Sequence, residues 1–222
     1  MDTIIYFTLS FAYVILFIWG VRLASQHGWK SVENVLLLVI LALIYDNIIL
    51  GLGKYIGEGE FLLSLNLVRY WLHALITPLL ILFAWRTLVN ANIEWSQTTT
   101  ARWMAFLFTL SLIIFDLVME VGNITLESNW SNGVLSYQSV HAVDNPPIMI
   151  IGVSMALFIT SIFVWVKQKW SWYFIGIVFM SITPLIGAWI GSDAFHNIGE
   201  FILLQSLLAT RSFQYQRNSP LN

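Results

Sequence analysis

Long stretches of almost uncharged, apolar sequence recur along the 222-residue chain, and they constrain its fold more than any other feature. Only 10% of the residues are charged, whereas a typical soluble domain has about 25%. An apolar stretch of about 20 residues can cross the hydrocarbon core of a bilayer as a helix. We therefore predict an all-α, polytopic integral membrane protein, with one transmembrane domain over residues 1–222 built as a seven-helix bundle. The predicted spans are 3–24, 34–53, 67–89, 102–122, 147–167, 171–190 and 194–213.

The lysines and arginines fall mostly at one end of these spans, and this predicts the orientation. Only Lys54 and Arg69 lie at the other end. Because Lys and Arg concentrate on the cytoplasmic side, the N-terminus is expected outside and the C-terminus inside. The short loops favour the inner (plasma) membrane of a bacterium, and we interpret the first apolar stretch as a retained helix. The residues expected on the cytoplasmic side are Arg22, Lys30, Arg86, Arg102, Lys167, Lys169, Arg211 and Arg217.

Several classes of protein are excluded by residues that the chain lacks. There is no cysteine, so disulfides, thiolate metal sites and a cysteine nucleophile are excluded. No basic tract indicates a nucleic-acid partner. No lysine lies in a span interior, which excludes a retinal Schiff base. The H-E-x-x-H, G-x-S-x-G and G-x-x-x-x-G-K-[ST] motifs are also absent.

Eight ionisable residues in or at the start of the spans fall in the extracytoplasmic half, and the inner half of every span carries almost no charge away from its end. Those on one span are three, four or seven residues apart, so they share one helix face. Because such residues are costly in hydrocarbon, these faces are expected to turn inward. We predict one outward-open cavity lined by spans 34–53, 67–89, 102–122 and 194–213. The residues are Asp46, Arg69, His73, Asp116, Glu120, Asp193, His196 and Glu200, with neutral partners at Asn47, Asn123, Asn197 and Gln205.

These residues predict acid–base chemistry. The pKa values of carboxyl groups crowded in a low-dielectric site move apart, so one group can donate a proton while another accepts it. The candidate catalytic residues are Asp46, Asp116, Glu120 and Glu200, paired as Asp116 with Glu120 and Glu200 with Asp46. The candidate substrate-binding residues are Arg69, Asn47, Asn123 and Asn197. A structural network of salt bridges among the carboxylates, Arg69 and the two histidines is the alternative.

A metal site is the second chemical possibility. His196-x-x-x-Glu200 places both side chains on one helix face. His73, His196 and Asp193 are candidate ligands for a divalent metal such as zinc, which would activate a water molecule. Asp193 has the simpler alternative of capping the last helix, and His73 that of a hydrogen-bonded packing residue.

Seven spans with intramembrane acids resemble the general plan of two enzyme families, the alkaline ceramidases and the fungal membrane-bound meroterpenoid cyclases. The first family has a His-x-x-x-His pair in its last span, where this chain has His196-x-x-x-Glu200. We expect an integral membrane enzyme that acts on a lipid or isoprenoid molecule, by hydrolysis or by proton-initiated isomerisation or cyclisation. The alternatives are a proton- or cation-coupled transporter, and a non-catalytic membrane subunit or cofactor-binding protein.

Two connections and two prolines also carry predictions. The glycine-rich segment 51–60 is expected to be a flexible turn, and the segment 123–146 is long enough to act as a lid. Thr77-Pro78 and Thr183-Pro184 are each expected to kink their helix.

Overall fold

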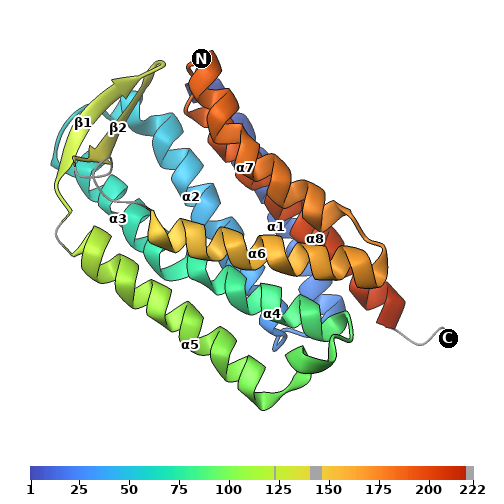
Figure 1. Cartoon of the computed structure of the whole chain (residues 1–222). Helices are drawn as coiled ribbons and strands as arrows, with labels where there is room; N and C mark the ends of the chain where they lie inside the picture. Colours follow the sequence, from blue (N-terminus) through green and yellow to red (C-terminus); the bar gives the residue numbers. More distant parts are fainter. Residues whose placement is uncertain (123, 141–146, 219–222) are drawn as a thin grey trace.

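The computed structural model describes residues 1–122, 124–140 and 147–218, and the chain is 82% helical. Its long helices run between two ends of the molecule (Figure 1). The helices are α1 (Asp2–His27), α2 (Val35–Ile56), α3 (Glu60–Ile76), α4 (Leu80–Asn90), α5 (Thr99–Asp116), α6 (Ile148–Gln168), α7 (Trp172–Ile190) and α8 (Ala194–Asn218). The short elements are the 3-10 turns η1 (Val32–Asn34), η2 (Thr77–Leu79) and η3 (Glu94–Gln97), the π-helical turn η4 (Leu117–Val121), and the strands β1 (Leu126–Ser131) and β2 (Val134–Ser139).

Within the described residues, six helical stretches are long and apolar enough to cross a membrane, as expected for a multi-pass membrane protein. They are Asp2–His27, Val32–Ile56, Glu60–Asn90, Thr99–Val121, Ile148–Gln168 and Trp172–Ile190. The predicted last span corresponds to α8, which is more polar than the six and packs along α7 and α1.

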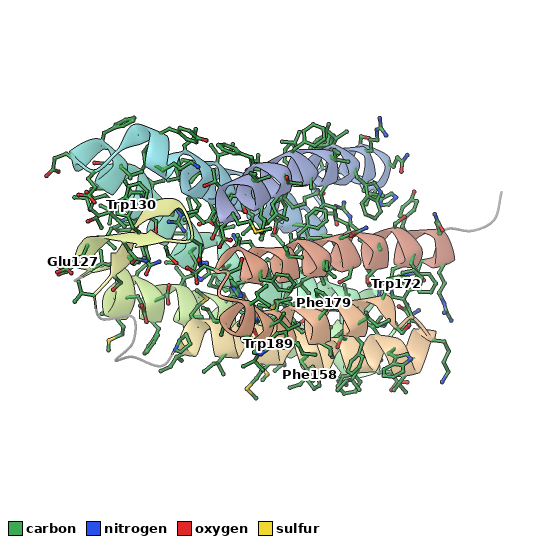
Figure 2. The ribbon with its side chains drawn as sticks, turned by 90° about the horizontal axis from the view of Figure 1, so that it is seen from above. Glu127, Trp130, Phe158, Trp172, Phe179 and Trp189 are labelled. Atoms are coloured by element: carbon green, nitrogen blue, oxygen red, sulfur yellow. The ribbon has the colours of Figure 1, made fainter. Side chains whose placement is uncertain are left out.

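Aromatic side chains project from the outer faces of α6 and α7 (Figure 2). Trp189 is 87% exposed at one end of α7, and Trp172 is also exposed at the other end. At 1.5 Å per residue the two lie about 26 Å apart along the helix, close to the thickness of a hydrocarbon core. Tryptophans prefer the two membrane–water interfaces, so this pair is placed as the anchors of a spanning helix would be.

A β-hairpin occupies most of the segment predicted as a lid loop. Strands β1 and β2 pair antiparallel, with Ser131 opposite Val134. Between them Asn132 and Gly133 have φ angles of 52° and 80°. Asn-Gly is the preferred pair for a two-residue hairpin turn with both φ angles positive, so the sequence did contain a signal for this element. The expectation of a purely helical protein is therefore wrong for this segment.

The hairpin packs directly on α2, and this explains Gly53. A Cβ atom at Gly53 would lie 1.8 Å from the carbonyl oxygen of Leu135 in β2, so no larger residue fits. Helix α2 runs on to Ile56, so the flexible turn expected from residue 51 is shorter than predicted. The chain turns instead around Gly57 and Gly59, whose φ angles of 84° and 148° favour glycine.

The start of the chain is held between the hairpin and α8. The Met1 amino group donates to the Asn132 carbonyl at 2.9 Å, and the Thr3 hydroxyl donates to the Gly133 carbonyl at 2.9 Å. The Asp2 carboxylate accepts from the Ser192 hydroxyl at 3.0 Å and from the Ala194 N–H at 3.3 Å. We call this the hairpin end of the molecule, and the other the opposite end.

The two proline positions behave differently. At Pro78 the helix is interrupted by the 3-10 turn η2, so α3 and α4 form one long but broken stretch. Helix α7 continues through Pro184 without interruption. The core between the two ends is apolar and closely packed, with Ile40, Phe83, Ile177, Leu207 and Leu208 fully buried.

Candidate functional site

A cavity of about 420 Å³ lies inside the hairpin half of the bundle. Helices α2, α3, α6 and α8 supply most of its walls, and β2 contributes Ser136, Gln138 and Ser139. Its deeper part is lined by apolar side chains, among them Val39, Ile76, Leu80, Leu157, Leu203 and Leu204. The polar side chains that line it are those of Asp46, Arg69, Tyr70, His73, Thr77, Ser154, Asp193, His196, Asn197 and Glu200, together with Tyr6 and the three strand residues. The cavity is thus amphipathic.

An ion pair between α2 and α3 forms part of the polar wall. Arg69 Nε donates to Asp46 Oδ1 at 2.7 Å, and both side chains are mostly buried, with exposed fractions of 17% and 24%. The other Asp46 oxygen accepts from Asn197 Nδ2 of α8 at 3.3 Å. Asp46 therefore joins three helices. Arg69, expected to hold a group of the substrate, is held by this protein's own carboxylate.

A histidine and a glutamate one turn apart on α8 form the second polar pair. His196 Nε2 lies 3.5 Å from Glu200 Oε1, and both residues line the cavity. The other ring nitrogen, Nδ1, is buried and has no hydrogen-bond partner among the described residues. The predicted shared face of His196 and Glu200 is confirmed, because the two side chains meet on one face of α8.

His73 and Asp193 also line the cavity. His73 Nδ1 lies 3.2 Å from the Thr77 hydroxyl, one turn further along the chain. Asp193 borders both the main cavity and a neighbouring cavity of about 30 Å³ that Asp2 also lines. In the part of the chain that the structure describes, no three His, Cys, Asp or Glu side chains are grouped closely enough to hold a metal ion. The proposed zinc ligands share a cavity without forming such a group.

Asp116 and Glu120, expected in the same cavity, do not line it. They lie at the end of α5 and in η4, and α5 lies at the periphery of the bundle beside α4 and α6 (Figure 1). Helix α6 lines the cavity where α5 was expected to do so. Its lining residues are Ile150, Val153, Ser154 and Leu157. Spacing shows which residues share a helix face but not which neighbour that face meets. The lining face of α6 is mostly apolar, so it carried no polar signal.

The two other predicted binding residues have different outcomes. Asn47 is fully buried behind the cavity wall, where its side-chain oxygen accepts from Asn197 Nδ2 at 3.4 Å and its amide donates to the Leu43 carbonyl. Asn123 lies outside the described residues.

Asn66 is a residue of the site that the sequence analysis missed. It is fully buried, and its side-chain oxygen accepts from Arg69 Nη1 at 2.7 Å and from the backbone N–H of Tyr137 at 3.2 Å. Asn66 therefore connects the ion pair of the cavity to strand β2. A signal was available, because Asn66, Arg69 and His73 are spaced i, i+3 and i+7 on one face of α3.

A second polar cluster, also missed, lies at the opposite end. Arg211 of α8 was expected at the membrane surface, but it is 1% exposed. One of its nitrogens donates to the Asn34 side chain at 2.8 Å, whereas Nε and Nη1 have no partner in the described part of the chain. The Gln214 amide donates to Gln168 Oε1 at 2.9 Å and to the Thr87 carbonyl at 3.0 Å. We call these five residues the opposite-end cluster.

A comparison with protein families found no family model that matches the chain, and a comparison with curated proteins found no match.

Proposed function

We propose that this protein is an integral membrane enzyme that performs acid–base chemistry on a lipid or isoprenoid molecule bound in the hairpin-end cavity. The observation that carries the proposal is the His196–Glu200 pair, which faces an amphipathic cavity of about 420 Å³. Small-molecule sites typically have volumes of about 300–1,000 Å³ and are mostly apolar, with a few convergent polar groups. An apolar tail would lie against the Leu-rich part, and the reacting head would face α8.

The two polar pairs take different roles in this proposal. His196 and Glu200 exchange a proton with the substrate, since a histidine beside a carboxylate is a common general base. Asp46 lies in the same cavity and is held in place by Arg69 and Asn197, so it is a candidate for a second proton-transfer group. Asp116 and Glu120 lie outside the cavity and stand outside the proposal.

A divalent metal such as zinc is the alternative use of the His196–Glu200 pair. The metal would polarise the substrate or activate a water molecule. Metal analysis of the gently solubilised protein beside a His196→Ala variant separates the two versions. Near-stoichiometric zinc that the variant loses supports metal-assisted hydrolysis, whereas equal metal content in both proteins contradicts it.

The proposal includes a membrane placement with seven spans, α8 being the seventh, and with the hairpin end outside the cytoplasm. Eight of the ten lysines and arginines belong to the parts of the helices nearer the opposite end or to its connections, and the positive-inside rule favours that end as cytoplasmic. A bacterial inner membrane is the proposed location. Labelling of single cysteines placed at Asn132 and at Glu94 in intact cells tests the placement: only the first should react with an impermeant reagent.

Loss of the Glu200 carboxyl group is the direct test of the acid–base role. The purified protein in nanodiscs is incubated with a membrane lipid extract, and substrate consumption is followed by mass spectrometry. Glu200→Gln should lower the rate by a factor of about 10²–10⁴. Glu60→Gln is the matched control, because Glu60 is an exposed glutamate of the hairpin end that does not line the cavity. A Glu200→Gln variant as active as the wild type contradicts the proposal.

A proton- or cation-coupled transporter is the second candidate, and the opposite-end cluster favours it. A transport pathway needs polar groups on both sides of its central site. Here a buried apolar layer that includes Phe83, Ile177 and Leu207 separates the cavity from the cluster. Transport would require these helices to move apart. Proton-driven flux in proteoliposomes that Glu200→Gln abolishes would favour transport over enzymatic turnover.

A further inference from the structure

The cavity carries an excess of negative charge. The carboxylates of Asp46, Asp193 and Glu200 line it, and the only lining lysine or arginine among the described residues is Arg69. Three carboxylates and one guanidinium leave a formal charge of −2, and a proton on His196 beside Glu200 would still leave an excess of one negative charge. An anionic group entering this space would meet like charges, and such juxtaposition disfavours binding.

Arg69 does not offset this excess for a ligand. Two of its three nitrogens are already engaged, Nε with Asp46 Oδ1 and Nη1 with Asn66 Oδ1, each at 2.7 Å. An incoming phosphate or carboxylate could accept from Nη2 alone without disturbing these contacts, whereas the usual two-point contact with a guanidinium would compete with Asp46 or Asn66. Breaking a buried ion pair in this way is strongly unfavourable.

Hydrogen-bond acceptors at the cavity remain available. Glu200 lies 3.5 Å from His196 Nε2, and its side chain lines the cavity with those of Ser154 and Asn197. An ammonium group has three donors and no acceptor, so it matches an environment rich in carboxylate and hydroxyl oxygens.

We propose that the molecule bound in this cavity has a basic amino head on an apolar tail, and that phosphate- or carboxylate-headed lipids are excluded. This inference rests on the proposed function, since it names the head group of the substrate class. The ammonium group would contact Glu200, and Asp193, in the turn that precedes α8, also lines the cavity. Arg69 acts as a positioning residue that holds Asp46, not as an anion receptor.

Binding of three amphiphiles with the same tail tests this directly. Dodecylamine, dodecanol and dodecyl phosphate are titrated at pH 7 into the full-length protein in nanodiscs of zwitterionic lipid, with empty nanodiscs as the blank. We expect the amine to bind at least about tenfold more tightly than the phosphate, with the alcohol between them. Equal or tighter binding of the phosphate overturns the inference while leaving the acid–base proposal in place.

Two variants locate the effect, and one serves as the control. Glu200→Gln and Asp193→Asn should each reduce the preference for the amine over the phosphate by several-fold, whereas Glu60→Gln should leave it unchanged. An amine preference that neither cavity variant alters places the amine elsewhere and overturns the inference. Failure of all three amphiphiles to bind overturns both this inference and the proposed function. Selective amine binding with normal turnover in Glu200→Gln overturns only the acid–base role.

Discussion

Two polar regions lie on the same helix, α8, and they are used differently. At the hairpin end, His196 and Glu200 face a cavity, where a ligand can reach them. At the opposite end, Arg211 and Gln214 are buried at 1% exposure against α4, α6 and the start of α2. Polar residues on one long helix can therefore either line a cavity or join helix ends. The environment, and not the residue type, distinguishes the two uses.

The comparison predicts that substitutions at the two ends will affect different properties. Cavity residues should control ligand binding and turnover with modest effects on stability. Residues of the opposite-end cluster should control stability with little effect on the ligand. The ion pair of Asp46 and Arg69 is the exception, because it belongs to the cavity wall and also joins helices.

Arg69→Ala is expected to have the largest effect. It leaves Asp46 without its countercharge and removes one of the two donors to Asn66, so the free energy of unfolding should fall by about 3–5 kcal/mol. Amine binding should weaken as well, because Asp46 loses its fixed position. Unfolding by SDS in mixed micelles measures the first effect. Arg22→Ala, at an exposed arginine of α1, is the control; if both variants lose equal stability, the ion pair does not hold this wall together.

Gln214→Leu should have an intermediate effect that is confined to stability. It removes the donors to Gln168 and to the buried Thr87 carbonyl, and unsatisfied buried groups cost about 1–3 kcal/mol. The same SDS titration measures this loss, and the affinity for dodecylamine should stay within twofold of the wild type, a change of about 0.4 kcal/mol. Gln205→Leu, at an exposed position of the same helix, should change neither. A large loss of ligand affinity in Gln214→Leu would mean that the two ends are coupled.

Thr3→Val should have the smallest effect, at the contact between α1 and the hairpin. The variant loses the hydrogen bond from Thr3 to the Gly133 carbonyl, worth about 0.5–1.5 kcal/mol. Amide hydrogen exchange in β1 and β2 should become faster while exchange in α7 stays unchanged. Thr8→Val is the control, because the Thr8 hydroxyl bonds only to Ile4 within α1. Unchanged exchange in the hairpin would show that this hydrogen bond does not hold it against α1.

Much of the architecture follows from local sequence. Apolar stretches of about 20 residues need their backbone hydrogen bonds satisfied internally, so helices are the expected result. The i, i+4 spacing of His196 and Glu200 likewise requires only helix geometry. The Asn132-Gly133 turn also has a local signal, because Asn-Gly is the preferred pair for a two-residue hairpin turn.

The partners of each polar face were decided by tertiary structure alone. The sequence by itself determined that the chain forms long apolar helices and that Asp46, Arg69, His196 and Glu200 lie toward one end. It did not determine that Arg69 meets Asp46, that α6 in place of α5 lines the cavity, or that Arg211 is buried. Helix periodicity fixes directions around a single axis, whereas the rotation and neighbours of each helix depend on packing across the whole bundle.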